Sequence, residues 1–119
     1  MKRILTILAL LCVAGTAYAY NYDKSLPLKG TTLTDEKVQT EALFPVYAFG
    51  LRAGAVGCKD FSIVDTVVSQ EKVDNKWQEI WTVNACSKNV LIPINFETKE
   101  SNTTFAIDPI NVKVRQVEQ

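Results

Sequence analysis

The stretch C58-KDFSIVDTVVSQEKVDNKWQEIWTVNA-C86 decides the fold of this chain. Two runs rich in β-branched and aromatic residues flank a polar segment, and a cysteine stands at each end. Such runs around a short polar segment are typical of a β-hairpin, and the turn is expected within residues 71–76, around Asp74-Asn75. The sequence therefore predicts a β-hairpin closed by a disulfide between Cys58 and Cys86.

The turn and the disulfide together constrain the strand register. A two-residue turn at Asp74-Asn75 pairs residues whose numbers sum to 149, whereas Cys58 and Cys86 sum to 144. The offset corresponds to about 17 Å along a strand, too far for a disulfide. Three solutions stay open: a longer loop, a β-bulge, or a Cys58 that precedes its strand and folds back.

The N-terminus has the features of a signal peptide. Lys2 and Arg3 precede an apolar run at residues 4–14, and Ala17-Tyr18-Ala19 fits a signal-peptidase site. Cleavage is expected after Ala19, so residues 1–19 are predicted to be removed. A retained membrane anchor is disfavoured because the run is too short for about 30 Å of hydrocarbon. A lipoprotein is disfavoured because leucine, not a small residue, precedes Cys12.

Processing changes the charge and the cysteine count. Without Lys2 and Arg3, 11 basic residues face 13 acidic ones, a net charge of −2. No basic stripe is present for nucleic-acid binding, and no second apolar run approaches membrane-spanning length. Cys12 leaves with the signal peptide, so an even pair remains for the oxidising compartment. Closing a loop of about 29 residues contributes about 3.6 kcal/mol in the chain-entropy model.

The remaining chain is long enough for one small domain. Residues 20–33 are predicted to be an extended N-terminal segment, and residues 34–117 a single α+β domain. A helix is expected to begin at Thr34, which can cap free backbone N–H groups, and Pro45 is expected to end, kink or restart it. Residues 45–57 suit a second helical segment or a strand, and the helix is favoured.

Two further alternating runs follow the hairpin. Residues 90–96 predict a third strand, which Pro93 places at an edge or at a bulge because proline cannot donate to a ladder. Residues 103–117 predict a fourth strand broken at Asp108-Pro109. Short connections favour antiparallel pairing, so the predicted fold is an N-terminal helix packed on a four-strand antiparallel meander with one disulfide. The alternative is a small all-β sandwich.

The residues that are missing exclude several chemistries. The chain has no histidine, no C-x-x-C and no glycine-rich nucleotide-binding motif. Histidine-based catalysis, His-ligated zinc, thioredoxin-like redox chemistry and nucleotide binding therefore lack the side chains that they need. No cofactor, metal site or catalytic residue is predicted.

The side chains with functional potential are carboxylates and aromatic rings. Carboxylates on or near the hairpin are expected to form a solvated face. The indoles of Trp77 and Trp81 share one strand face and form either core or an exposed binding platform. Tyr20 and Tyr22 are a second possible binding surface. The carboxylates in question are Asp60, Asp65, Glu71 and Glu79.

The segment W77-Q-E-I-W-T-V-N-A-C86, with V90-L-I-P-I-N-F96 and T103-T-F-A-I107 after it, carries a resemblance. It resembles small exported proteins of Gram-negative bacteria with a W-x-E-x-W-x-V-x-x-C-G signature, followed by an alternating strand and a G-G-T-x-F turn. This chain departs from that pattern at Ser87 and at Ser101-Asn102, where glycine is usual. The resemblance covers residues 58–107 and implies a periplasmic or secreted address without an activity.

These observations predict an exported, non-catalytic binding or interaction module of the bacterial cell envelope, periplasmic or secreted. The expected partner is another envelope protein or a glycan, with no nucleic acid and no membrane span after signal cleavage. The alternative is a small carboxylate-dependent hydrolase of cell-wall or glycan material, which requires Asp65 and Glu79, or another acidic pair, to converge in a pocket. A third possibility is a structural subunit that pairs through the strand of Pro93.

Overall fold

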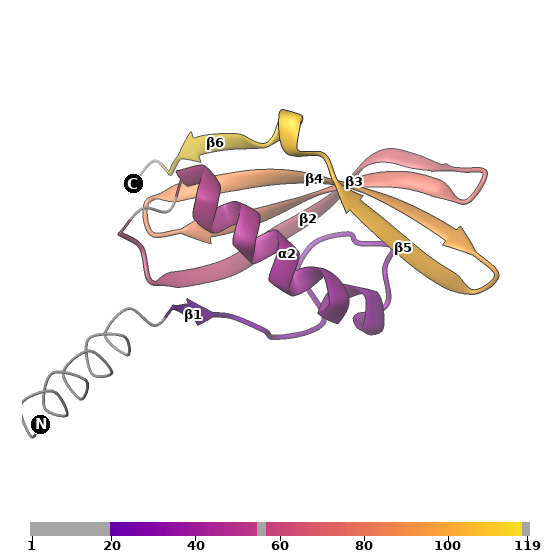
Figure 1. Ribbon diagram of the computed structural model, residues 1–119, viewed down its shortest axis with the longest axis horizontal. Helices are drawn as coiled ribbons and strands as arrows, with labels where there is room; N and C mark the ends of the chain where they lie inside the picture. Colours follow the sequence, from indigo (N-terminus) through magenta and orange to yellow (C-terminus); the bar gives the residue numbers. More distant parts are fainter. Residues whose placement is uncertain (1–19, 55–56, 118–119) are drawn as a thin grey trace, which may run out of the picture.

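The computed structural model describes residues 20–54 and 57–117, and the predicted signal peptide lies outside them. One helix packs against a curled, six-stranded sheet, which confirms a mixed α+β fold (Figure 1). The sheet order is β1-β2-β3-β4-β5, and β6 also pairs with β4. The elements are β1 (Asn21–Tyr22), α2 (Glu36–Gly54), β2 (Asp60–Val73), β3 (Lys76–Ala85), β4 (Lys88–Lys99), β5 (Asn102–Ile107), the 3-10 helix η1 (Pro109–Asn111) and β6 (Lys113–Gln116).

The β2–β3 hairpin turns where the sequence predicts. Asp74 and Asn75 have φ values of 53° and 64°, the left-handed conformation that a two-residue hairpin turn requires. Val73 pairs with Lys76 beside this turn, but three register shifts follow along β2. As a result Phe61 pairs with Ala85. The turn prediction is confirmed, and the longer-loop alternative is wrong.

The register shifts also bring the two cysteines together. Cys58 lies before β2, and its Cα is 5.9 Å from that of Cys86 in the disulfide. The bulges and the position of Cys58 before its strand therefore both contribute, and the predicted disulfide is confirmed. The bulges also decide which β2 side chains face inward: Thr66 is fully buried, whereas Val67 is largely exposed.

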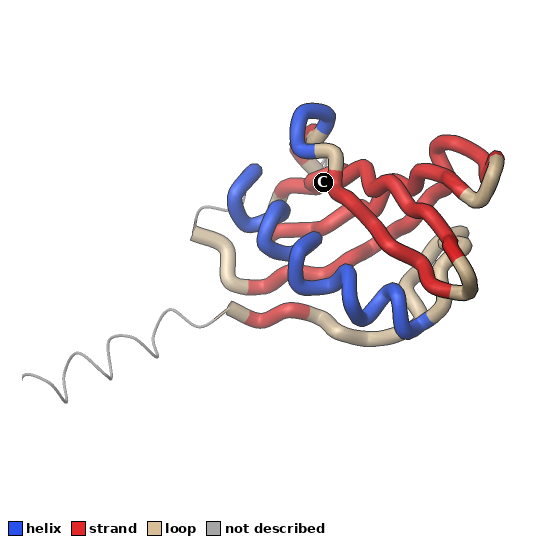
Figure 2. The backbone as a smooth tube through the Cα atoms, turned by 45° about the vertical axis from the view of Figure 1, so that its right-hand side comes forward, coloured by secondary structure: helices blue, strands red, loops and turns tan. Residues whose placement is uncertain are grey.

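The strand alternation of β3 and β4 builds the core. Along β3, every second residue from Trp77 to Ala85 is buried. Figure 2 shows that α2 lies along one face of the sheet, and the buried side chains lie between the two. Gly50 of α2 approaches closely, because a Cβ there would lie 3.0 Å from the Cγ1 of Val83. The fully buried residues of the sheet are Thr66, Glu79, Trp81, Val83, Val90, Ile92, Ile94 and Phe96.

The helix is continuous through Pro45 and ends at Gly54. The all-β sandwich alternative is therefore wrong for residues 45–54. Asp35, not Thr34, caps the helix, since its carboxylate accepts a hydrogen bond of 2.9 Å from the backbone N–H of Val38. Val38, Ala42 and Leu43 lie on the inward face of the helix and are buried.

The predicted four-strand meander is wrong in its details. β1 precedes the helix and pairs parallel with β2. The predicted fourth strand is two strands, β5 and β6, that share one edge of β4. β4 is thus a central strand, and its register with β3 has no bulge at Pro93, so neither the edge nor the bulge predicted at Pro93 is present. The Pro93 carbonyl accepts a hydrogen bond from the N–H of Asp108, so the missing donor of Pro93 faces the break between β5 and β6.

The N-terminal segment is an integral part of the fold. The N–H of Thr31 donates to the carbonyl of Thr66, and the Thr66 hydroxyl donates to the carbonyl of Lys29. Gly30 allows this approach: its φ is 104°, and a Cβ there would lie 2.2 Å from the Thr66 carbonyl oxygen. Residues 29–31 therefore cover part of the outer edge of β2.

Candidate functional site

The carboxylate of Glu79 lies in the core between the two tryptophans. Its side chain has no exposed surface. The indole N–H of Trp77 donates to Oε2 at 2.8 Å, and the indole N–H of Trp81 donates to Oε1 at 2.9 Å. The backbone N–H of Leu33 also donates to Oε2, at 2.9 Å. The expectation that the hairpin carboxylates form a solvated face is wrong for Glu79.

This arrangement follows from the period of a strand. Residues 77, 79 and 81 point to the same face, so the two indoles flank the carboxylate. Donors on both sides offset the cost of burying a charged group. The bond from Leu33 fastens the N-terminal segment, 46 residues away in sequence, to the middle of β3. Glu79 thus joins β3 to the N-terminal segment.

The two tryptophans do not form a surface platform. Trp81 is fully buried and 5 % of Trp77 is exposed. Their rings pack on Phe96, with centroids 5.3 Å away for Trp77 and 5.9 Å away for Trp81. Of the two alternatives for this pair, core packing is the one present, and the binding-surface alternative is wrong for both indoles.

The carboxylate pair considered for hydrolysis is not available to a substrate. Glu79 is buried with both oxygens hydrogen-bonded, whereas Asp65 is exposed and pairs with Thr82 across the hairpin. In the pairing of β2 with β3, the residue opposite Glu79 is Val68, not Asp65. General acid or base work requires contact with the substrate, and Glu79 offers none here. Asp60 and Glu71 are exposed on separate parts of β2.

Tyr20 and Tyr22 belong to an aromatic cluster at the start of the described chain. Tyr22 is half-buried, with its ring 5.0 Å from that of Tyr47 and 5.3 Å from that of Phe61. Tyr20 packs on the same Phe61 at 5.9 Å and keeps 43 % of its surface exposed. Tyr20 therefore remains a possible contact residue, whereas Tyr22 anchors β1.

Tyr47 fixes this cluster to the sheet. Its hydroxyl donates to the carbonyl of Asp23 and accepts a hydrogen bond of 3.2 Å from the N–H of Ile63. Burial raises the pKa of Tyr47 to about 12. The pKa of the neighbouring Asp23 carboxyl is lowered by its hydrogen bonds from Ser25. The Tyr47 hydroxyl thus holds the N-terminal segment against β2, whereas the Asp23 carboxyl forms its hydrogen bonds within that segment.

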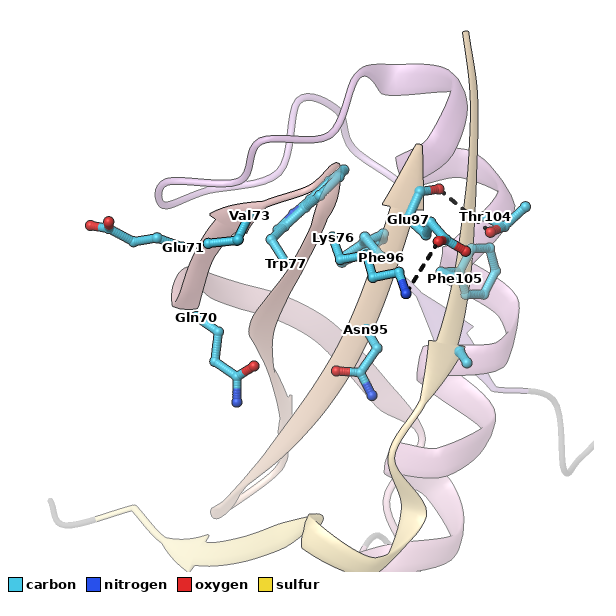
Figure 3. Close-up of a pocket in the computed structure, with 11 residues that line it drawn as sticks. Gln70, Glu71, Val73, Lys76, Trp77, Asn95, Phe96, Glu97, Thr104 and Phe105 are labelled. Carbon is cyan, nitrogen blue, oxygen red and sulfur yellow. Dashed lines mark hydrogen bonds and ion pairs between the residues drawn. The ribbon is translucent and has the colours of Figure 1, made fainter. Parts of the chain in front are cut away.

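The face of the sheet that α2 does not cover carries two grooves, and we call it the open face. The residues of β3 and β4 that alternate with the buried ones lie on it. The larger groove, of about 670 Å³, lies where the two long hairpins end (Figure 3). In Figure 3, Gln70 stands on one side, and Asn95 and Thr104 stand on the other.

The polar side chains of this groove are available for contacts, and its lining also includes the apolar residues Val73, Trp77, Phe96, Phe105 and Ala106. Within the described chain, Gln70 makes no side-chain hydrogen bond and Asn95 uses only its oxygen, which accepts from Gln78 at 3.0 Å. The groove also holds the exposed ion pair of Lys76 and Glu97, with N and O 3.6 Å apart. Such a surface is suited to hydrogen bonding with a partner molecule.

The second groove, of about 330 Å³, continues the first toward β6. Gln70 lines both. Its floor is apolar and its rim on β6 is basic. Its lining comprises Gln70, Gln78, Ile80, Leu91, Pro93, Asp108, Asn111, Lys113 and Arg115. The sequence alone did not indicate either groove, because each is lined by residues of strands that lie far apart in the sequence.

The described residues contain no cluster of three or more histidine, cysteine, aspartate or glutamate side chains able to hold a metal ion. In the same ranges, no helix has the length and hydrophobicity that a bilayer crossing needs. No protein-family model, no curated protein and no solved structure matches the chain. The resemblance to small exported proteins therefore stays a prediction, and the open face is the candidate functional site.

Proposed function

We propose that the protein is an exported, non-catalytic binding module of the bacterial cell envelope that contacts another envelope protein through its open face. The observation that carries this proposal is the groove of about 670 Å³, whose Gln70 and Asn95 amides keep hydrogen-bonding capacity that the described chain does not use. Exposed polar groups of this kind form the hydrogen bonds of protein interfaces.

The rest of the molecule supports a binding role through rigidity. The disulfide, the Glu79 cluster and the docked N-terminal segment all fix the β2–β3 hairpin that forms one side of the groove. A preformed surface loses little conformational entropy when it binds. The predicted signal peptide and the disulfide both suit an oxidising, extracytoplasmic compartment.

Site-specific photo-cross-linking in cells tests this proposal. The photoreactive amino acid p-benzoylphenylalanine replaces Asn95 in the groove or, as the control, Phe44, which is 80 % exposed on α2. After irradiation, the tagged protein is purified and its adducts are identified by mass spectrometry. We expect one dominant protein adduct from position 95 and none from position 44. Equal adducts at both positions, or none at either, would reject the open face as a protein-binding surface.

A further inference from the structure

We propose that the β6 side of the open face binds an acidic, extended segment of the partner protein, with Lys113 and Arg115 holding its carboxylates. The inference rests on the proposed function, since it names the chemistry of the partner that the same face contacts. Three features of the smaller groove lead to it: its charge, its unused hydrogen-bond donors and its apolar floor.

The rim of this groove on β6 is positively charged. Lys113 pairs with Leu91 and Arg115 pairs with Asn89, so the two cations follow one another on the same side of β6. Both are exposed, and neither has an ion-pair partner in residues 20–54 and 57–117. The one carboxylate in the lining, Asp108, accepts a hydrogen bond of 2.7 Å from Asn111. Exposed cations without an ion-pair partner favour an anionic partner molecule.

The unused hydrogen-bond donors of the groove indicate the shape of the ligand as well as its charge. The Arg115 guanidinium presents a planar fork that matches a carboxylate, and Lys113 adds an ammonium beside it. The amides of Gln70 and Asn95 offer further donors toward the larger groove. A peptide supplies the matching acceptors, because its backbone carbonyls suit amide donors and its acidic side chains suit the two cations.

The floor of the groove favours a peptide over other anions. Ile80, Leu91 and Pro93 offer a small apolar strip, and their exposure is limited. This strip fits short apolar side chains and is too limited to bury an acyl chain. The lining contains no aromatic ring on which a sugar could stack. An anionic lipid and an acidic glycan are therefore the less favoured partners.

The length of the face fits an extended segment. Asn89 and Asn95 lie six residues apart on β4, which is about 20 Å in a strand. A segment of about six residues in extended conformation covers that distance. Its side chains then alternate, so that apolar residues at every second position face the floor and the acidic residues between them lie toward the cations on the β6 rim. This spacing suggests a peptide that alternates glutamate and a small apolar residue.

Fluorescence anisotropy with a synthetic peptide tests the inference. The probe is a labelled Glu-Val-Glu-Val-Glu-Val peptide with Gly-Ser ends, and a second peptide carries glutamine in place of glutamate. We expect binding of the first peptide to weaken at least tenfold in the Lys113→Glu/Arg115→Glu variant and on raising NaCl from 20 to 200 mM. The control is Lys24→Glu/Lys29→Glu, which makes the same charge change in the N-terminal segment. We expect it to change binding less than twofold.

Three outcomes would overturn the inference. The first is no binding of the glutamate peptide, or equal binding of the glutamine peptide. The second is an equal loss in the two double variants. The third is binding to phosphatidylglycerol vesicles, but not to the peptide, that depends on Lys113 and Arg115, which would assign the cations to a membrane surface.

The in-cell experiment separates this inference from the proposed function. If position 95 captures a protein and Lys113→Glu/Arg115→Glu leaves the adduct unchanged, the acidic-peptide inference fails and the binding role stands. If position 95 captures nothing, the proposed function fails as well. The circular-dichroism melting curve of each variant checks that the fold is retained, and exposed charges on β6 are expected to leave it unchanged.

Discussion

On the face of the sheet that packs against α2, a carboxylate has a hydrogen-bond donor for each oxygen. On the open face, the Gln70 amide and the cations of Lys113 and Arg115 have no side-chain partner inside the described chain. Burial explains the difference. A buried polar group is costly unless it is bonded within the fold, whereas an exposed one is satisfied by water until another molecule replaces that water. The inner polar groups therefore stabilise the fold, and the outer ones are free to bind.

The largest effect is expected at Glu79. Glu79→Ala leaves the indole N–H groups of Trp77 and Trp81 and the N–H of Leu33 without an acceptor. Buried unpaired donors are strongly destabilising, so we expect a loss of about 3–5 kcal/mol in the free energy of unfolding, measured with urea. Glu79→Gln keeps the shape but turns an NH₂ group toward a donor, and we expect about 2 kcal/mol.

Glu97→Ala is the matched control on the open face. Glu97 forms its ion pairs with two exposed lysines, at 3.6 and 3.7 Å. Exposed pairs of this kind contribute about 0.2–1 kcal/mol. Comparable losses for Glu79→Ala and Glu97→Ala would remove the distinction between the two faces.

Loss of the disulfide is expected to rank next. The double variant Cys58→Ala/Cys86→Ala frees a loop that the disulfide closes, and we expect a loss of about 3 kcal/mol in the free energy of unfolding. Urea unfolding of the unaltered chain under reducing conditions should give the same midpoint as the double variant. A midpoint that reductant does not move would show that the disulfide contributes nothing to stability.

Tyr47→Phe is expected to have an intermediate effect on the free energy of unfolding, and this effect depends on pH. Because its pKa is raised to about 12 in the folded chain, above its ordinary value of 10, the folded state holds the phenol proton more tightly than the unfolded state. The resulting stabilisation is complete below pH 10 and is lost between pH 10 and pH 12. Tyr47→Phe should cost about 1–2 kcal/mol at pH 7 through its lost hydrogen bonds.

Urea unfolding of both proteins at pH 7, 10 and 11.5 checks the Tyr47 prediction. The stability difference between them should shrink as the pH rises through this range. A constant difference would mean that the buried hydroxyl keeps an ordinary pKa, and that the N-terminal segment is held by its other contacts.

The outcome at Glu79 shows what could be predicted from the sequence. The period of two places residues 77, 79 and 81 on one face, but charged residues are rarely fully buried, so a solvated carboxylate was the expectation. The signal that could have corrected it is the W-x-E-x-W spacing itself, which places an indole donor on each side of the carboxylate. The local sequence pattern thus identified the two indole neighbours of Glu79. Only the packing of α2 on the sheet shows that water is excluded from the carboxylate.

For the fold as well, local features could be predicted from the sequence and long-range ones could not. The turn and the disulfide follow from local chemistry at Asp74-Asn75 and from the even cysteine count. The register shifts along β2 reconcile that turn with the Cys58–Cys86 bond. The sequence showed that the register must change between the two, but not at which residues. The prediction at Pro93 was wrong because the side of Pro93 that lacks a donor faces the break between β5 and β6. The position of that break depends on where residues 102–116 pair with β4.

The smallest effect on stability is expected on the open face. Gln70→Ala/Asn95→Ala removes two exposed amides, of which only that of Asn95 makes a hydrogen bond within the described chain, at 3.0 Å from Gln78. Exposed substitutions of this kind usually change the free energy of unfolding by less than about 0.5 kcal/mol. The same variant should reduce the adduct formed from p-benzoylphenylalanine placed at Thr104, across the groove. A stability loss above about 1.5 kcal/mol would make these amides structural, like Glu79, and would leave the open face without a surplus of hydrogen-bonding groups for a partner.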